Sequence, residues 1–196
     1  MAGPGATAGR VAMNADDQPL LDALASSQRL GMLGSLPIPD VIAHAEAFVG
    51  ALADVRGVVV DLGSGGGVPG LVIAARRPDL QLVLVDRRRT RTDHLHRLVG
   101  RLDWSARVEV VTAQAAALPS VLGDSVDAVV ARGFGAPPAV LTAAAPLLAG
   151  GGRLVVSEPP SGSSSRWPVD VSAWDLQIVV HADARVIVFQ RALCST

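Results

Sequence analysis

The sequence has few of the features that mark secreted or membrane-spanning proteins. It contains a single cysteine, Cys194, among 196 residues, so no disulfide can form within the chain, and this favours a reducing compartment. No apolar run reaches the roughly 20 residues that span a bilayer. The first residues also lack the apolar stretch of a secretory signal. These absences predict a cytoplasmic protein that does not enter a membrane.

Lysine and tyrosine are absent, and aromatic side chains are rare. All 17 basic residues are arginine, and Phe and Trp occur 3 times each, so the core must consist mostly of Val, Leu and Ala. The net charge of −1 gives no global basic field that would attract nucleic acid. His94 and His96 stand two apart, so on a helix they point to different faces, and one cysteine gives no zinc pattern. We therefore predict no metal.

The charge is nevertheless unevenly distributed along the chain. Residues 87–107 carry seven arginines and only two aspartates. The run begins at the start of a predicted helix, where cations oppose the helix dipole. This local cost favours an anionic partner such as RNA phosphate, although a solvated basic face explains the run equally well.

The hydrophobic pattern divides the chain into three parts. Residues 1–18 read as a disordered tail. Residues 19–55 contain two stretches with helical spacing, about 20–30 and 39–52, and form a short helical N-terminal cap. From residue 56 to residue 196 the pattern becomes that of an α/β domain.

In this domain, short Val-rich segments alternate with helical stretches. The predicted strands are 58–62, 81–85, 107–111, 126–131 and 153–157, and the predicted helices between them are 71–77, 90–102, 113–118 and 138–148. Such alternation predicts a parallel sheet covered on both faces. Segments 174–180 and 185–191 follow with a short link, which predicts an antiparallel hairpin. The arrangement resembles the Rossmann-like, seven-stranded, mostly parallel sheet of class I S-adenosylmethionine-dependent methyltransferases.

The stretch "VVVDLGSGGGVPG", residues 58–70, places five glycines after the first strand. Glycine permits positive φ and close backbone approach, and amides at the following helix start can hold an anion. Two motifs fit. Gly65, Gly67 and Gly70 match the dinucleotide pattern G-x-G-x-x-G, whereas Asp61, Gly63, Gly65 and Gly67 match the methyltransferase pattern D-x-G-x-G-x-G.

Acidic residues at two strand ends favour the methyltransferase pattern. Asp61 suits a ligand ammonium and would repel a pyrophosphate, and Asp86, after the second strand, suits ribose hydroxyls. The second feature also occurs in NAD-binding proteins. NAD binding therefore stays open as an alternative.

A wider stretch is similar to one family, the bacterial small-subunit ribosomal RNA guanine-N7 methyltransferases, also called glucose-inhibited division protein B. The similarity lies in "VVVDLGSGGGVPGLVIAARRPDLQLVLVD", in "RRTRTDHL" with Arg91, in "VVARGFGAP" with Arg132 and Phe134, and in "IAHAEAF" with His44. The chain departs from the family pattern at Ala47, Ala116 and Glu158.

The resemblance implies S-adenosylmethionine as cofactor and methyl transfer to guanine N7 of ribosomal RNA in the 30S subunit. It places Arg91, Arg132 and His44 nearest the acceptor as candidate catalytic residues. The predicted cofactor-binding residues are Asp61, Gly63, Gly65, Gly67, Gly70, Asp86, Ala115, Ala116 and Arg132. Two alternatives stay open: a small-molecule methyltransferase, which the net charge of −1 favours, and a non-catalytic cofactor-binding subunit that needs a partner.

Overall fold

The computed structural model describes residues 17–122, 125–158, 165–167, 170–179 and 185–193. Of the disordered tail predicted over residues 1–18, residues 1–16 lie outside the described part of the chain. Asp17 is buried, and Gln18 begins the first helix. Within the described residues, none of the helices combines the length and apolarity that crossing a membrane requires.

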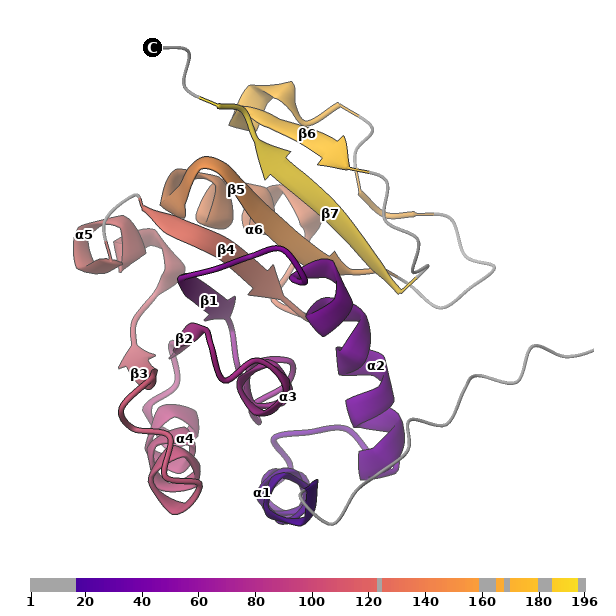
Figure 1. Ribbon diagram of the computed structural model, residues 1–196, viewed down its shortest axis with the longest axis vertical. Coiled ribbons are helices and arrows are strands. Elements are labelled where there is room, and N and C mark those ends of the chain that lie inside the picture. Colours follow the sequence, from indigo (N-terminus) through magenta and orange to yellow (C-terminus); the bar gives the residue numbers. More distant parts are fainter. Residues whose placement is uncertain (1–16, 123–124, 159–164, 168–169, 180–184, 194–196) are drawn as a thin grey trace, which may run out of the picture.

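One seven-stranded sheet organises the described chain, in the order β3-β2-β1-β4-β5-β7-β6 (Figure 1). The strands are β1 (Val58–Leu62), β2 (Gln81–Asp86), β3 (Val108–Thr112), β4 (Val126–Ala131), β5 (Leu148–Ser157), β6 (Leu176–Val179) and β7 (Val186–Arg191). Strands β1 to β5 are parallel, and β7 lies antiparallel between β5 and β6. The predicted mostly parallel sheet with a C-terminal antiparallel hairpin is confirmed.

Alternate residues of the central strands enter two separate cores, as the period-2 geometry of a strand requires. Val59, Leu82 and Val155 pack on one face, while Val60, Val83 and Val156 pack on the other. All six are buried, because helices cover both faces. This explains why the strands read as continuous apolar runs in the sequence.

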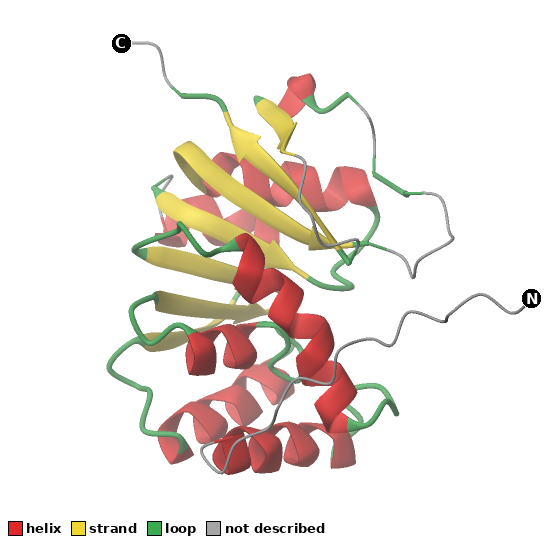
Figure 2. Cartoon of the chain, turned by 45° about the vertical axis from the view of Figure 1, so that its right-hand side comes forward, coloured by secondary structure: helices red, strands yellow, loops and turns green. Residues whose placement is uncertain are grey.

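Helices α1 (Gln18–Arg29), α2 (Ile38–Ala51), α3 (Gly70–Arg76) and α4 (Arg89–Arg101) contribute to the first core. Helices α5 (Leu118–Leu122) and α6 (Pro137–Ala144) and the 3₁₀ turn η3 (Ala145–Leu147) contribute to the second. Figure 2 shows α2 crossing in front of the strands, with further helices behind them.

Polar contacts bind the two N-terminal helices to the sheet domain. Arg76 of α3 pairs with both Asp17 and Glu46. The buried His94 ring of α4 bonds through Nε2 to the Ser27 hydroxyl of α1 at 2.9 Å. These helices therefore belong to the packed body of the molecule.

Most elements lie within two residues of their predicted bounds, and three differ more. The helix predicted at 138–148 ends at Ala144 and continues as the 3₁₀ turn η3. Strand β5 begins at Leu148, not residue 153, because Gly150–Gly152 continue it with a register shift against β4, and Gly151 has a positive φ. The helix predicted at 113–118 is instead a 3₁₀ turn, Ala115–Ala117, followed by α5. Residues 113 and 114 remain extended and continue the exit from β3.

Candidate functional site

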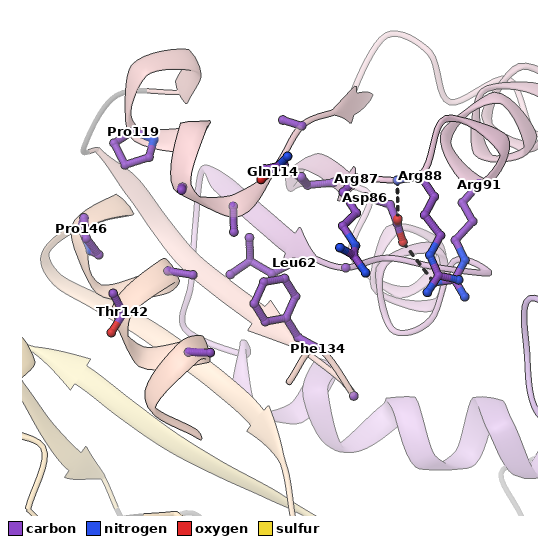
Figure 3. A pocket seen from close by; sticks show the side chains of 18 of the residues that line it. Leu62, Asp86, Arg87, Arg88, Arg91, Gln114, Pro119, Phe134, Thr142 and Pro146 are labelled. Atoms are coloured by element: carbon purple, nitrogen blue, oxygen red, sulfur yellow. Dashed lines mark hydrogen bonds and ion pairs between the residues drawn. The ribbon is translucent and has the colours of Figure 1, made fainter. Parts of the chain in front are cut away.

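A cavity of about 930 Å³ opens where β1, β2, β3 and β4 end (Figure 3). From β1 the chain proceeds outward to β2 and β3 and then returns to β4 on the other side of β1. Ligands of open parallel sheets bind at such a reversal point. The lining residues are Leu62, Gly63, Val85, Asp86, Arg87, Arg88, Arg91, Ala113, Gln114, Ala115, Ala116, Pro119, Gly133, Phe134, Pro138, Ala139, Thr142, Ala143 and Pro146. We call this space the first cavity.

The turn after β1 forms one wall of the first cavity and requires glycine at Gly63. The φ angle of this residue is 72°, a conformation that glycine adopts without strain. The amides of Gly63 and Ser64 both donate hydrogen bonds to the Val85 carbonyl, at 2.8 and 2.9 Å. A Cβ atom at Gly63 would lie 2.8 Å from the Phe134 ring. Phe134 therefore packs directly over this turn.

Gly66, Gly67 and Gly70 make room for protein atoms. Added Cβ atoms would collide with leucine side chains: at Gly66 with Leu33, at Gly67 with Leu71 and at Gly70 with Leu84. Gly65, Gly67 and Gly70 do not line the first cavity. The glycine density thus has a packing cause that the sequence analysis missed, and contact of these three residues with a cofactor stays a prediction.

Asp61 is almost fully buried beneath the turn, with 1% of its surface exposed. Its Oδ2 accepts a hydrogen bond from the Gly70 amide at 3.0 Å, whereas its Oδ1 has no hydrogen-bond partner among the described residues. Burial raises the pKa of Asp61 to about 7, although the Ser64 hydroxyl, the Gly70 amide and the Arg132 charge oppose this rise. An unpartnered buried carboxylate oxygen costs stability, and a cationic ligand group would relieve that cost.

Asp86 lies at the end of β2 and ties three backbone segments together. Its Oδ2 accepts from the Gly65 amide at 3.1 Å and from Arg91 Nη1 at 3.3 Å, while its Oδ1 accepts from the Arg88 amide at 2.9 Å. Figure 3 shows this carboxylate at the arginine-lined side of the cavity. Oδ1 accepts one hydrogen bond and has a further lone pair, so Asp86 can still accept a hydrogen bond from a ligand hydroxyl there.

Several predicted site residues do line the first cavity, and others come from segments that the sequence analysis did not single out. Gly63, Asp86, Arg91, Ala115 and Ala116 line it, whereas Asp61 does not, and the roles predicted for these residues stay predictions. The wall formed by α6 and η3 was missed; it consists of Pro138, Ala139, Thr142, Ala143 and Pro146. Small and proline residues at a helix start carry no chemical signal, so only the fold reveals this wall.

His44 and Arg132 line a second cavity of about 380 Å³. The lining residues are His44, Phe48, Arg132, Gly133, Ser157, Glu158, Arg166 and Arg185. Gly133 also lines the first cavity, so the two spaces meet after β4. The structure thus separates the three candidate catalytic residues: Arg91 lies with Asp86 in the first cavity, and His44 and Arg132 lie in the second.

Among the described residues, no three His, Cys, Asp or Glu side chains lie close enough together to hold a metal ion.

The fold and the position of the first cavity define a class I methyltransferase architecture. The chain superimposes on a putative caffeoyl-CoA O-methyltransferase from Staphylococcus aureus with a TM-score of 0.64, at 9% identity, covering 92% of this chain and 93% of that one. A methyltransferase from Geobacter sulfurreducens gives a TM-score of 0.62 at 15% identity, covering 87% and 88%. At these identities the likeness concerns the fold.

The sequence places the chain more narrowly. The model of the rRNA small subunit methyltransferase G family, GidB, matches residues 26–158, and the chain belongs to this family. The ribosomal RNA small subunit methyltransferase G of Leifsonia xyli is 33% identical over 161 residues, which cover 81% of this chain and 74% of that protein.

Other curated relatives match over shorter stretches. The protein of the same name from Salinispora tropica is 47% identical over 62 residues, 32% of this chain and 26% of its own length. That from Mycobacterium marinum is 40% identical over 90 residues, 46% of this chain and 39% of its own length. The chain thus spans about a quarter to two fifths of the length of these two relatives.

Proposed function

We propose that this chain is an S-adenosylmethionine-dependent methyltransferase that methylates guanine N7 in small-subunit ribosomal RNA, and hence acts in the cytoplasm. The observation that carries the proposal is the cavity at the reversal point of the sheet. It lies beside two acidic strand ends, in a chain of the GidB family. Family membership supports the RNA substrate, and the cavity supports a nucleoside cofactor.

The residues around the first cavity fit S-adenosylmethionine. Asp61 lies beneath the turn and does not line the cavity, but its buried Oδ1, which has no hydrogen-bond partner among the described residues, would accept a hydrogen bond from the ammonium group. Asp86 would accept from the ribose hydroxyls, and Ala115 and Ala116 offer an apolar wall for the base. When bound, S-adenosylmethionine supplies a methyl group on a sulfonium centre.

Guanine N7 places a modest demand on the chain's own residues. This nitrogen carries a free in-plane lone pair, so no proton has to be removed before it attacks. The chain then needs to position the acceptor and exclude water, and no general base is required. Arg132 and His44 in the second cavity and Arg91 at the first would do the positioning.

The test measures transfer of labelled methyl groups to isolated 30S subunits, followed by digestion and mass spectrometry of the nucleosides. We expect 7-methylguanosine. Asp86→Asn should lower the affinity for S-adenosylhomocysteine by about 10- to 100-fold, because a hydrogen bond to a charged group contributes about 1.5–3 kcal/mol. The matched control is Asp93→Asn, which removes an exposed aspartate that pairs with Arg89 at 3.8 Å.

Each failure points to a different alternative. If S-adenosylhomocysteine binds but no label enters RNA, the acceptor is a small molecule or the chain is a non-catalytic subunit, and light scattering with a candidate partner separates the two. A thermal shift with NAD but none with S-adenosylhomocysteine would overturn the cofactor itself.

A further inference from the structure

The second cavity collects positive charge from distant segments of the chain. Three arginines, Arg132, Arg166 and Arg185, line it together with His44, while among the described residues Glu158 is its only carboxylate. Glu158 Oε1 accepts a hydrogen bond from the Ser165 hydroxyl at 2.8 Å. Arg166 and Arg185 lie beyond residues 26–158, which the family model matches.

Arg132 brings a poorly solvated cation to this cavity. Burial lowers the pKa of Arg132, and the nearby Asp61 charge opposes that change. None of the residues that the structure describes accepts a hydrogen bond from its guanidinium or forms an ion pair with it within 4.0 Å. A half-buried guanidinium in this position favours an anion in the adjoining space.

Trp167 fixes the segment that carries Arg166. The indole is buried, with 6% exposed, and packs edge-on against Phe189 at 5.7 Å between ring centroids. Its Nε1 donates to the Ser157 carbonyl at 3.2 Å. The guanidinium carbon of Arg166 lies 5.2 Å from the indole centroid, within the range of a cation–π interaction. The exposed Arg166 side chain is thereby held at the cavity.

Arg185 is held from the opposite side. It precedes β7, and its Nη1 donates to the Ala43 carbonyl of α2 at 2.6 Å. Its own carbonyl accepts from the Glu158 amide at 2.8 Å. The first contact holds the guanidinium at α2, where His44 lines the same cavity, and the second fixes the backbone of Arg185.

We propose that Arg132, Arg166 and Arg185 form a subsite for a phosphate group of the acceptor RNA, and that Trp167 is the residue that positions Arg166 in it. The inference rests on the proposed function for the identity of the ligand. Gly133 joins the subsite to the first cavity, so a phosphate bound there would lie close to a base presented to the cofactor.

The test compares binding of a short, labelled single-stranded RNA from the small-subunit sequence by fluorescence anisotropy at several salt concentrations. For Arg166→Gln with Arg185→Gln we expect a loss of affinity of about 10- to 100-fold at low salt. The slope of log K against log salt should become shallower by about 0.7, since the subsite holds one phosphate and each phosphate contact in a single strand contributes about 0.7. The double Lys variant should restore most of the slope.

The matched control is Arg56→Gln. Arg56 is an exposed arginine that precedes β1, at the opposite end of the strands, and its loss should leave the slope unchanged. If the double variant does not fold, Arg166→Gln alone still tests the subsite, with an expected change of up to about 0.7 in slope. Equal slopes for the wild type and Arg166→Gln overturn the proposal.

Trp167→Phe tests the positioning role, because it keeps a ring but removes the indole N–H. It should weaken RNA binding when residue 166 is Arg and have no effect when residue 166 is Gln, which a double-mutant cycle measures. Equal losses in both backgrounds would show that Trp167 acts only through stability.

Two further measurements separate this proposal from the proposed function. S-adenosylhomocysteine affinity by calorimetry should be the same in all these variants. A wild type that binds RNA with the full slope but transfers no methyl group contradicts the function and leaves the subsite intact. The last outcome is that inorganic phosphate raises the melting temperature of the wild type and RNA does not displace the phosphate. In that case the site binds free phosphate, and the RNA assignment is overturned.

Discussion

The two cavities meet at Gly133, at the same edge of the sheet, but they are built from different parts of the chain and by different interactions. The first cavity is formed largely by turns that directly follow β1 to β4, and its polar contacts use backbone amides and buried carboxylates. The second cavity collects side chains from α2, from the ends of β4 and β5, and from the approach to β7. Its described charged side chains include three arginines and Glu158, and Arg166 is exposed. The first cavity also has three arginines, but all of them lie in the single segment after β2.

This contrast has a consequence for binding. Contacts that rely on buried groups should be strong, sensitive to single atoms and little affected by salt, because desolvated interactions are poorly screened. Contacts through partly exposed arginines should be individually weaker, partly additive and strongly salt-dependent. The first cavity thus suits one defined small ligand, and the second suits a polyanion.

The largest expected effect concerns Asp61. Its pKa is about 7 in the folded protein and 3.8 in the reference state, so the folded protein holds the proton more tightly. The stabilisation by this group is complete below the lower pKa and is lost as the pH rises through about 7. At about 1.4 kcal/mol for each pH unit between the two values, the free energy of unfolding should fall by about 4 kcal/mol.

Urea unfolding at a series of pH values measures this change, and Asp61→Asn is the matched variant. The difference between the two proteins isolates Asp61 from other titrating groups. A cationic ligand would bind the ionised carboxylate, so S-adenosylhomocysteine should also bind more tightly above pH 7 than below it. Parallel stability curves for the wild type and Asp61→Asn would contradict this account.

A smaller effect is expected for Gly70→Ala. The added Cβ would overlap Leu84 and lie 2.5 Å from Asp61 Oδ2, so it should both overpack the core, at a cost of about 1–3 kcal/mol, and displace Asp61. Gly100→Ala is the control, because a Cβ there meets nothing within 4 Å and should stabilise α4 by about 0.5–1 kcal/mol. Thermal unfolding and calorimetry with S-adenosylhomocysteine measure both effects. Unchanged affinity in a destabilised Gly70→Ala protein would separate the loop packing from ligand binding.

The sequence predicts the first cavity better than the second because local signals are stronger than distant ones. Val58–Leu62 followed by the glycines is a contiguous pattern, and its strand bounds agree with the structure. The place of Asp86 beside the glycine loop is predicted on the same ground, since the carboxyl ends of parallel strands share one edge of the sheet. The pattern does not reveal that Gly66 accommodates Leu33, because that contact joins residues from separate helical and loop segments.

The second cavity depends on tertiary packing that no local pattern encodes. Arg132 and His44 were selected through a family resemblance, and nothing in their spacing showed that they share a cavity. Arg166 lies in a Ser- and Pro-rich segment that has no periodicity, and only the burial of Trp167 against Phe189 reveals that it is anchored. Arg185 precedes a strand whose antiparallel placement sets its position beside α2.

The smallest expected effect concerns Arg91, which belongs to the first cavity by position but resembles the second in chemistry. Its Nη1 lies 3.3 Å from Asp86 Oδ2. Asp86 keeps the amides of Gly65 and Arg88 when Arg91 is lost. Arg91→Gln should therefore cost at most about 1 kcal/mol of stability and change S-adenosylhomocysteine affinity only slightly. The salt slope of RNA binding should fall by about 0.7 if Arg91 contacts a phosphate.

The control for Arg91→Gln is Arg89→Gln on the same helix. Arg89 has 86% of its side chain exposed and lines neither cavity. Its substitution therefore measures the effect of losing one positive charge near the site when no contact inside a cavity is lost. If Arg91→Gln lowers cofactor affinity as much as Asp86→Asn does, Arg91 orients Asp86 and acts on the cofactor. A shallower salt dependence of RNA binding with unchanged cofactor affinity would instead show that the RNA contact surface extends from the second cavity across the mouth of the first. Arg91 could then reach a neighbouring phosphate while the buried carboxylates hold the nucleoside.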